Sequence, residues 1–202
     1  MTTSTPLDWQ SIFLGLKSGI ERFGVAVAER QLGPETTGTF DGLNITTNTL
    51  FDAETRCHNM AHSFGHIAQW SLDFERFRTL YDDLYAAKAE AADHPQRLEA
   101  ALARFREYEE EASEYAAWLY LEIGCPEAIP AFTNFARADI EAIVGFHRDG
   151  IAPRWCEFFS AWNTRVACGE CTLQAFTPRP VPPFIPRKID EQEIIQEVDG
   201  LP

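Results

Sequence analysis

The chain has 202 residues, of which 45% are hydrophobic and 12% aromatic, and its formal net charge is −14. The length and the apolar fraction are those of one folded domain with an ordinary core, and they argue against a disordered chain. The acidic balance repels phosphate backbones, so no nucleic-acid partner is expected, and no stretch approaches the about 20 apolar residues of a membrane span.

Steps of three and four between apolar residues predict six helices, over residues 8–31, 52–70, 73–93, 96–123, 127–147 and 154–167. Asp8 and Asp52 are the expected N-caps of the first two helices. Between these helices, β-branched residues within 36–50 predict a loop and a small antiparallel β element. The fold class is therefore expected to be mainly α, of the α+β type.

The composition changes after Cys171. The proline-rich residues 177–186 cannot continue a helix and should be extended, either as a strap on the protein's own surface or as a ligand for another module. Residues 190–202 are acidic, with apolar residues spaced for a short amphipathic helix. We therefore expect one helical domain over residues 1–176, followed by an extended and acidic tail over residues 177–202.

Two histidines four residues apart, His62 and His66, lie in one predicted helix. Residues at this spacing share a helix face, so both imidazoles can hold one divalent metal ion, although ordinary hydrogen-bonded histidines are the alternative. Gly65 favours the metal site, because a glycine inside a helix costs about 1 kcal/mol relative to alanine and so indicates close approach of another element. His58 lies too far along the axis to share the ion with both, and should belong to the core or support the site.

A second predicted helix supplies a carboxylate beside small residues. Glu109, Ala112 and Ala116 follow at steps of three and four, and so lie on one face. Such a face lets this helix lie close to the histidines, with Glu109 as a third ligand and the fourth position open, as in catalytic zinc sites. Glu111 points away from this face and is the weaker candidate. A solvated acidic face is the alternative.

Together these segments resemble the ImmA/IrrE family of metallopeptidase-like proteins. The family has a run like Phe-Thr-x-Ala-His-Glu-x-Gly-His, and residues 57–66 read Cys-His-Asn-Met-Ala-His-Ser-Phe-Gly-His. It then has a helix like Glu-x-x-Ala-Asn-x-Phe-Ala-Ala, and residues 109–117 read Glu-Glu-Glu-Ala-Ser-Glu-Tyr-Ala-Ala. The resemblance covers roughly residues 40–122 and implies a zincin-like helical fold with a small sheet. It also implies His62, His66 and Glu109 as zinc ligands.

Ser63 stands where the family carries its catalytic glutamate, and Ser113 replaces the usual asparagine or aspartate. Peptide hydrolysis at a zinc ion needs a carboxylate to take and deliver a proton, and a serine hydroxyl is a poor base. Loss of such a base typically removes about 10²–10⁴-fold in rate. Hydrolysis by the usual mechanism is therefore not expected. Glu110 or Glu54 could substitute from another direction, but no spacing demands either.

The five cysteines are an odd count, and the first residues lack the pattern of a signal peptide. We therefore expect a cytoplasmic protein with reduced thiols or metal ligands. Cys168 and Cys171 form a C-x2-C pair, which with His147 and Cys156 could make a second, structural zinc site. The spacing is irregular, and free thiols are the default.

Three functions remain open from the sequence. The leading one is a metal-binding, metallopeptidase-like protein without the usual base, which binds a peptide or protein partner. Zinc suits two histidines and a glutamate, although iron or manganese fits a similar ligand set. The alternatives are an active zinc hydrolase with a displaced carboxylate base, and a metal-free helical interaction protein.

Overall fold

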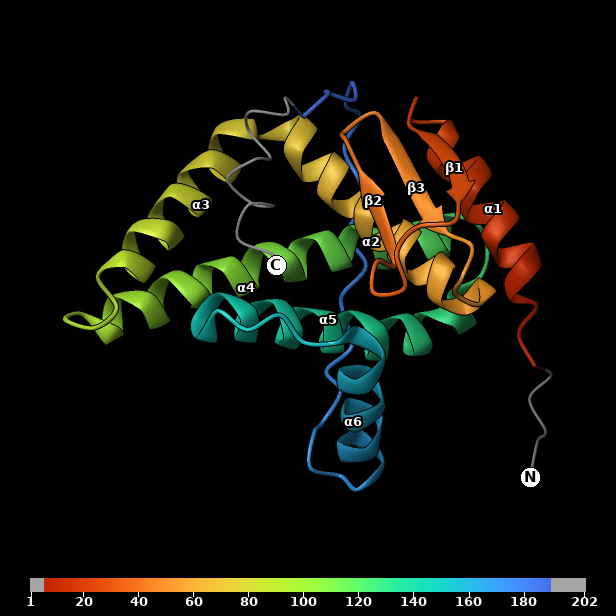
Figure 1. Cartoon of the computed structure of the whole chain (residues 1–202). Helices are drawn as coiled ribbons and strands as arrows, with labels where there is room; N and C mark the ends of the chain where they lie inside the picture. The colour runs from red at the N-terminus through yellow and green to blue at the C-terminus, as the bar shows by residue number, and fades with distance from the viewer. Residues whose placement is uncertain (1–5, 190–202) are drawn as a thin grey trace.

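The computed structural model describes residues 6–189, so the helix predicted within 190–202 lies outside the described residues. The elements follow in chain order as α1 (Trp9–Glu21), β1 (Ala26–Arg30), β2 (Gly38–Phe40), β3 (Asn44–Asn48), α2 (Ala53–Leu72), α3 (Phe74–Ala89), α4 (Pro95–Glu122), the 3-10 turn η1 (Pro126–Ala128), α5 (Ile129–Asp149) and α6 (Trp155–Ala167). The predicted fold class is confirmed: within the described part, the chain is mostly helical with one small sheet (Figure 1).

The first helix is shorter than its apolar spacing predicts. A single helix over residues 8–31 is wrong, because α1 ends before β1 begins. Gly24, between them, has a φ of +82°, a conformation that suits glycine and stops the helix. Beyond it Val25 and Val27 are buried, with more exposed residues between and after them, which is the alternation of a strand.

The sheet is mixed and has the strand order β1-β3-β2. Strand β3 pairs in parallel with β1 and antiparallel with β2. The predicted antiparallel element is therefore correct for the β2–β3 pair only. The parallel pair was not expected, since β1 lies in a segment whose spacing also fits a helix.

Helix α2 is the central element, because it packs against α1, α4, α5 and two strands of the sheet. Asp52 caps its first turn, as predicted, by accepting a hydrogen bond from the Thr55 N–H at 2.7 Å. Gly38 permits the sheet to lie close to this helix, because a Cβ there would stand 2.1 Å from Oδ1 of Asn59. The edge strand β2 is thereby held against the middle of α2.

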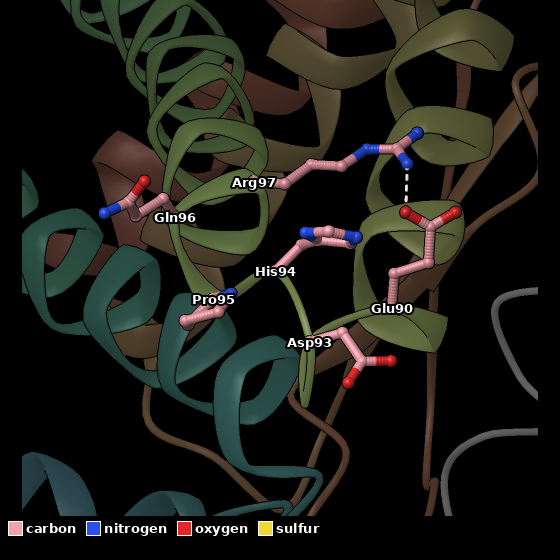
Figure 2. A pocket seen from close by; sticks show the side chains of 6 residues that line it. All are labelled: Glu90, Asp93, His94, Pro95, Gln96 and Arg97. Atoms are coloured by element: carbon pink, nitrogen blue, oxygen red, sulfur yellow. Dashed lines mark hydrogen bonds and ion pairs between the residues drawn. The ribbon is translucent and has the colours of Figure 1, made fainter.

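Helices α3 and α4 form a hairpin, α5 lies along α4, and α6 projects away from them (Figure 1). The turn of the hairpin contains Asp93-His94-Pro95, where the sequence predicts a break. Figure 2 shows an open hollow at this turn, in which Glu90 and Arg97 form an ion pair beside His94. Both charges are satisfied, and Arg97 is about 18 Å along α4 from Glu109, so this hollow is separate from the predicted site.

The proline-rich residues 177–186, with the residues that follow to 189, form an extended strap on the protein's own surface. Its Val181 is buried, and the ring of Phe184 stacks on Phe23 with centroids 5.5 Å apart. The strap ends beside the sheet, where the Ile189 N–H donates to the carbonyl oxygen of Asp41 at 2.8 Å. Of the two interpretations of this segment, the strap is the one that the contacts favour.

Among residues 6–189, no helix combines the length and the apolar character that crossing a membrane requires.

Candidate metal centre

The two helices that carry the predicted ligands touch backbone to backbone. A Cβ added at Gly65 of α2 would lie 2.1 Å from the carbonyl oxygen of Ala112 in α4. Ala112 and Ala116 are fully buried at this crossing. The close approach predicted from the glycine and the alanines is therefore confirmed, and it places Glu109 opposite the histidines.

His62, His66 and Glu109 converge on one point. The Nε2 atoms of the two histidines are 3.0 Å apart. The Oε2 atom of Glu109 lies 3.3 Å from Nε2 of His62 and 3.1 Å from Nε2 of His66. A tetrahedral ion with bonds of about 2.0–2.1 Å separates its donor atoms by about 3.3 Å. The triangle of donor atoms therefore has the size of one face of a metal coordination sphere.

The hydrogen bonds of Ser113 determine which nitrogen of His62 carries a proton. The Ser113 hydroxyl donates its only hydrogen to the carbonyl oxygen of Glu109 at 3.0 Å. At 3.3 Å from Nδ1 of His62 it must then act as an acceptor, so Nδ1 is the protonated nitrogen. Nε2 of a neutral His62 is left with a lone pair that points into the triangle.

Gln69 has the same effect on His66. Its amide Nε2 donates to the carbonyl oxygen of Tyr108 and to Oε2 of Glu111, both at 2.8 Å. These bonds direct Oε1 of Gln69 toward Nδ1 of His66 at 3.2 Å, where it accepts the imidazole proton. Such support behind a ligand fixes its tautomer and orientation, as is usual for metal-binding histidines.

The triangle therefore contains three lone pairs and no proton when both histidines are neutral. The three side chains are nearly buried, with exposed fractions of 8% for His62, 14% for His66 and 3% for Glu109. Converging lone pairs in a dry site repel one another, and a cation between them removes that cost. The described residues contain one such group of three or more potential ligands, and it is this one.

The electrostatics of Glu109 also favour positive charge in the site. Burial by itself raises the pKa of this carboxyl group. The interactions with His66 and His62 outweigh burial, with His66 contributing most, and the pKa of Glu109 lies well below its usual range. The carboxyl group is thus ionised and available to a cation.

Two aromatic rings stack against the His66 imidazole. The ring of Phe40, on the edge strand β2, is stacked against it with centroids 5.9 Å apart. The ring of Tyr108 is stacked at 5.8 Å. Tyr108 also lines a hollow between α3 and α4, with Arg76, Leu80 and Arg104 among its other walls. Tyr108 thus contacts both His66 and this hollow, whose walls do not include His62, His66 or Glu109.

Asp139 is a site residue that sequence reasoning missed. It extends from α5, and its Oδ2 atom lies 3.7 Å from Nε2 of His62 with 24% of the side chain exposed. Burial and the neighbouring Glu109 raise its pKa, against the opposing effect of His62. A sequence signal existed, because an aspartate stands here within a stripe of apolar residues: Phe132, Phe135, Ala136, Ala142 and Ile143.

The carboxylates proposed as substitute bases lie elsewhere. Glu110 forms an ion pair with Arg137, and Glu54 lies 3.7 Å from Nε2 of His58. Glu111 supports Gln69 and pairs with arginines, as expected for a residue off the ligand face. Ser63 is buried on α2, and its side chain carries no carboxylate.

His58 is a core histidine, one of the two roles expected for it. Its Nδ1 atom is 2.8 Å from the hydroxyl oxygen of Tyr120, and its ring packs against Trp9 and Phe135. Only 2% of the residue is exposed. It takes no part in the triangle of donor atoms.

The second zinc site that the sequence left as an alternative to free thiols does not assemble among the described residues. His147 is buried against the ring of Phe105, with centroids 4.7 Å apart, whereas Cys156 and Cys168 are exposed and Cys171 is half-buried. These four are not among the described residues that gather into a potential metal group. His147 belongs to α5, whereas Cys156 belongs to α6 and Cys168 and Cys171 lie at and after its end.

All five cysteines lie in the described part of the chain as free thiols. Burial raises the pKa of Cys57 to about 12, which makes it an unreactive core thiol.

Comparisons of the chain with protein-family models, with curated proteins and with solved structures each found no match.

Proposed function

We propose that this protein binds one divalent metal ion through His62, His66 and Glu109, and that the ion presents an open position to a ligand. The proposal rests on one observation: three donor atoms lie 3.0–3.3 Å apart with their lone pairs directed at a common point. Zinc is the preferred ion, since two imidazoles and one carboxylate are a usual zinc set. Iron or manganese suits similar ligands.

The role that we propose for this centre is binding rather than hydrolysis by the usual metallopeptidase mechanism. Ser63 offers no carboxylate at the expected position, and Glu110 is paired with Arg137. Tyr108, which lines the hollow between α3 and α4, and Phe40, on the edge strand β2, both stack against His66. We infer a peptide or protein ligand in the manner of an ImmA/IrrE-like protein, a resemblance that is supported by the close pair of motif-bearing helices.

Zinc affinity of the full chain tests the metal centre. Competition with a chromophoric chelator should give one zinc per chain for the unchanged protein. His62→Ala should lose this binding, because two remaining ligands hold zinc poorly. The matched control is His94→Ala, at the exposed turn shown in Figure 2, which should bind as the unchanged protein does. Equal affinity in all three proteins would refute the proposed centre.

Cleavage of a peptide library tests the binding role. The zinc-loaded protein should leave the library intact, whereas Ser63→Glu should gain cleavage if the frame is otherwise that of a metallopeptidase. Cleavage by the unchanged protein that a chelator abolishes would contradict the binding role.

The contact of Asp139 with His62 favours a second candidate, a metal-dependent hydrolase whose carboxylate comes from α5 instead of α2. Under this alternative the unchanged protein cleaves peptides, and Asp139→Asn loses the activity. Glu110→Gln should then keep it, because Glu110 is held by Arg137.

A further inference from the structure

We propose that Asp139 belongs to the metal centre as the carboxylate that accepts a hydrogen bond from the ligand on its open side. The site would then select ligands that combine an oxygen donor for the ion with a neighbouring O–H or N–H for Asp139. This inference rests on the proposed metal centre and deepens it, since it names the chemical class of the ligand.

The position of Asp139 distinguishes it from the three ligands. Its Oδ2 atom is 3.7 Å from Nε2 of His62, beyond hydrogen-bond length. Its oxygens do not join the group of donor atoms that all lie within 4.8 Å of one another. A carboxylate that stands close to the donor atoms without joining them would be placed to accept a hydrogen bond from the O–H or N–H group of a bound ligand.

Asp139 also has no competing cationic partner in the described residues. Its one ion-pair contact within 4.0 Å is with His62. The two arginines of this helix are paired elsewhere. Arg137 forms an ion pair with Glu110, and Arg148 forms one with Glu99. The carboxylate is thus left facing the centre, and its acceptor capacity is available to a ligand there.

The charges around the site agree with this role. Two neutral imidazoles and the Glu109 carboxylate leave a divalent ion with one net positive charge. Asp139 supplies a second negative charge beside the same site, which makes the assembly neutral in a largely buried place. A ligand with an O–H or N–H group can donate a hydrogen bond to the Asp139 carboxylate. An anion without such a group is repelled by the negative charge of Asp139.

Acetohydroxamic acid is a suitable probe, because it joins an oxygen donor to an adjacent N–O–H group. The full chain would be loaded with Co²⁺, and binding of the probe followed by visible absorption. The unchanged protein, Asp139→Asn and the control Glu110→Gln should each hold one cobalt. Asp139→Asn should bind acetohydroxamic acid about tenfold more weakly or worse, since a charged hydrogen-bond acceptor is lost. Glu110→Gln should bind it normally.

Azide supplies a second readout, because it coordinates a metal without donating a hydrogen bond. Asp139→Asn should bind azide as tightly as the unchanged protein or more tightly. Asp139→Ser, with a smaller polar side chain, should behave as Asp139→Asn does. Agreement between the two variants shows that the effect comes from loss of the carboxylate and not from a structural change specific to one of them.

Three results would overturn the inference. Unchanged acetohydroxamic acid binding in both Asp139 variants would remove the acceptor role while leaving the metal centre intact. Loss of cobalt from both variants would make Asp139 a fourth ligand instead. An unchanged protein that takes up no cobalt would refute the metal centre and the inference together, so the two failures are distinguishable.

Discussion

At the scale of single residues, the candidate site depends on where the two histidines carry their protons as well as on the three donor atoms. Ser113 and Gln69 each accept the Nδ1 proton of one histidine, and each is itself fixed by a donor bond to backbone carbonyl oxygen. Sequence reasoning identified the three donors but gave these two residues no role. Their effect depends on which atoms face one another across two helices, which helix spacing alone does not determine.

Ser113→Ala should weaken zinc binding without unfolding the protein. The change removes the acceptor that holds the His62 proton on Nδ1, so the imidazole is free to adopt the tautomer that does not bind. Support of this kind is typically worth about 10–100-fold in metal affinity. Chelator competition would measure it, with Ser18→Ala at an exposed position of α1 as the control. Equal affinity in the two variants would show that Ser113 does not orient the ligand.

At the scale of elements, the crossing of α2 and α4 positions the donors, and much of it could be predicted. The helical spacing, Gly65 and the alanine stripe all indicated a close crossing, which the structure confirms. The strand β1 could not be separated from α1, because Val27 fits both a helical stripe and a strand. The place of Asp139 follows from how α5 packs on the other helices, and that packing is a tertiary property.

Gly65→Ala should damage both stability and metal binding. The new methyl group would stand 2.1 Å from the Ala112 carbonyl oxygen, and backbone must shift to admit it. Overpacking of this kind costs about 1–3 kcal/mol, and moving α4 takes Glu109 from the histidines. Urea unfolding and chelator competition would record the two effects.

Gly145→Ala is the matched control, because a Cβ there meets nothing within 4 Å. This variant should be as stable as the unchanged protein, or more stable by up to about 1 kcal/mol, since alanine is the better helix former. Similar behaviour of the two variants would contradict the close crossing.

At the scale of the whole molecule, α2 is enclosed by α1, α4, α5 and the sheet, and the strap returns to the sheet from the far end of the chain. The same burial that brings His62, His66 and Glu109 together also encloses polar groups outside that cluster. His147 is one of them: it is 7% exposed, and its Nδ1 atom has no hydrogen-bond partner among the described residues. Such a group makes stability depend on pH.

Acidification should destabilise the protein through His147. Burial lowers its pKa from 6.5 to about 4, and the charge of Lys88 adds to this effect. Between these values the unfolded chain binds a proton that the folded protein excludes, so the free energy of unfolding falls as the pH falls. This group contributes up to about 1.4 kcal/mol per pH unit.

Replacing His147 by phenylalanine keeps an aromatic ring in the pocket and removes the titration. Urea unfolding of the metal-free protein from pH 7 to pH 4.5 should show a smaller loss of stability for His147→Phe than for the unchanged protein. The same loss in both would mean that the pKa of this imidazole is the same in the folded and unfolded states.

X-ray absorption at the zinc edge is the measurement that tests the central claim most directly, because it reports the atoms bound to the ion. Protein loaded with one equivalent of zinc should show only nitrogen and oxygen neighbours at about 2.0–2.2 Å, with the outer-shell pattern of two imidazoles. Sulfur at about 2.3 Å would assign the ion to cysteines instead. That result, or a protein that takes up no zinc, would contradict a centre built from His62, His66 and Glu109.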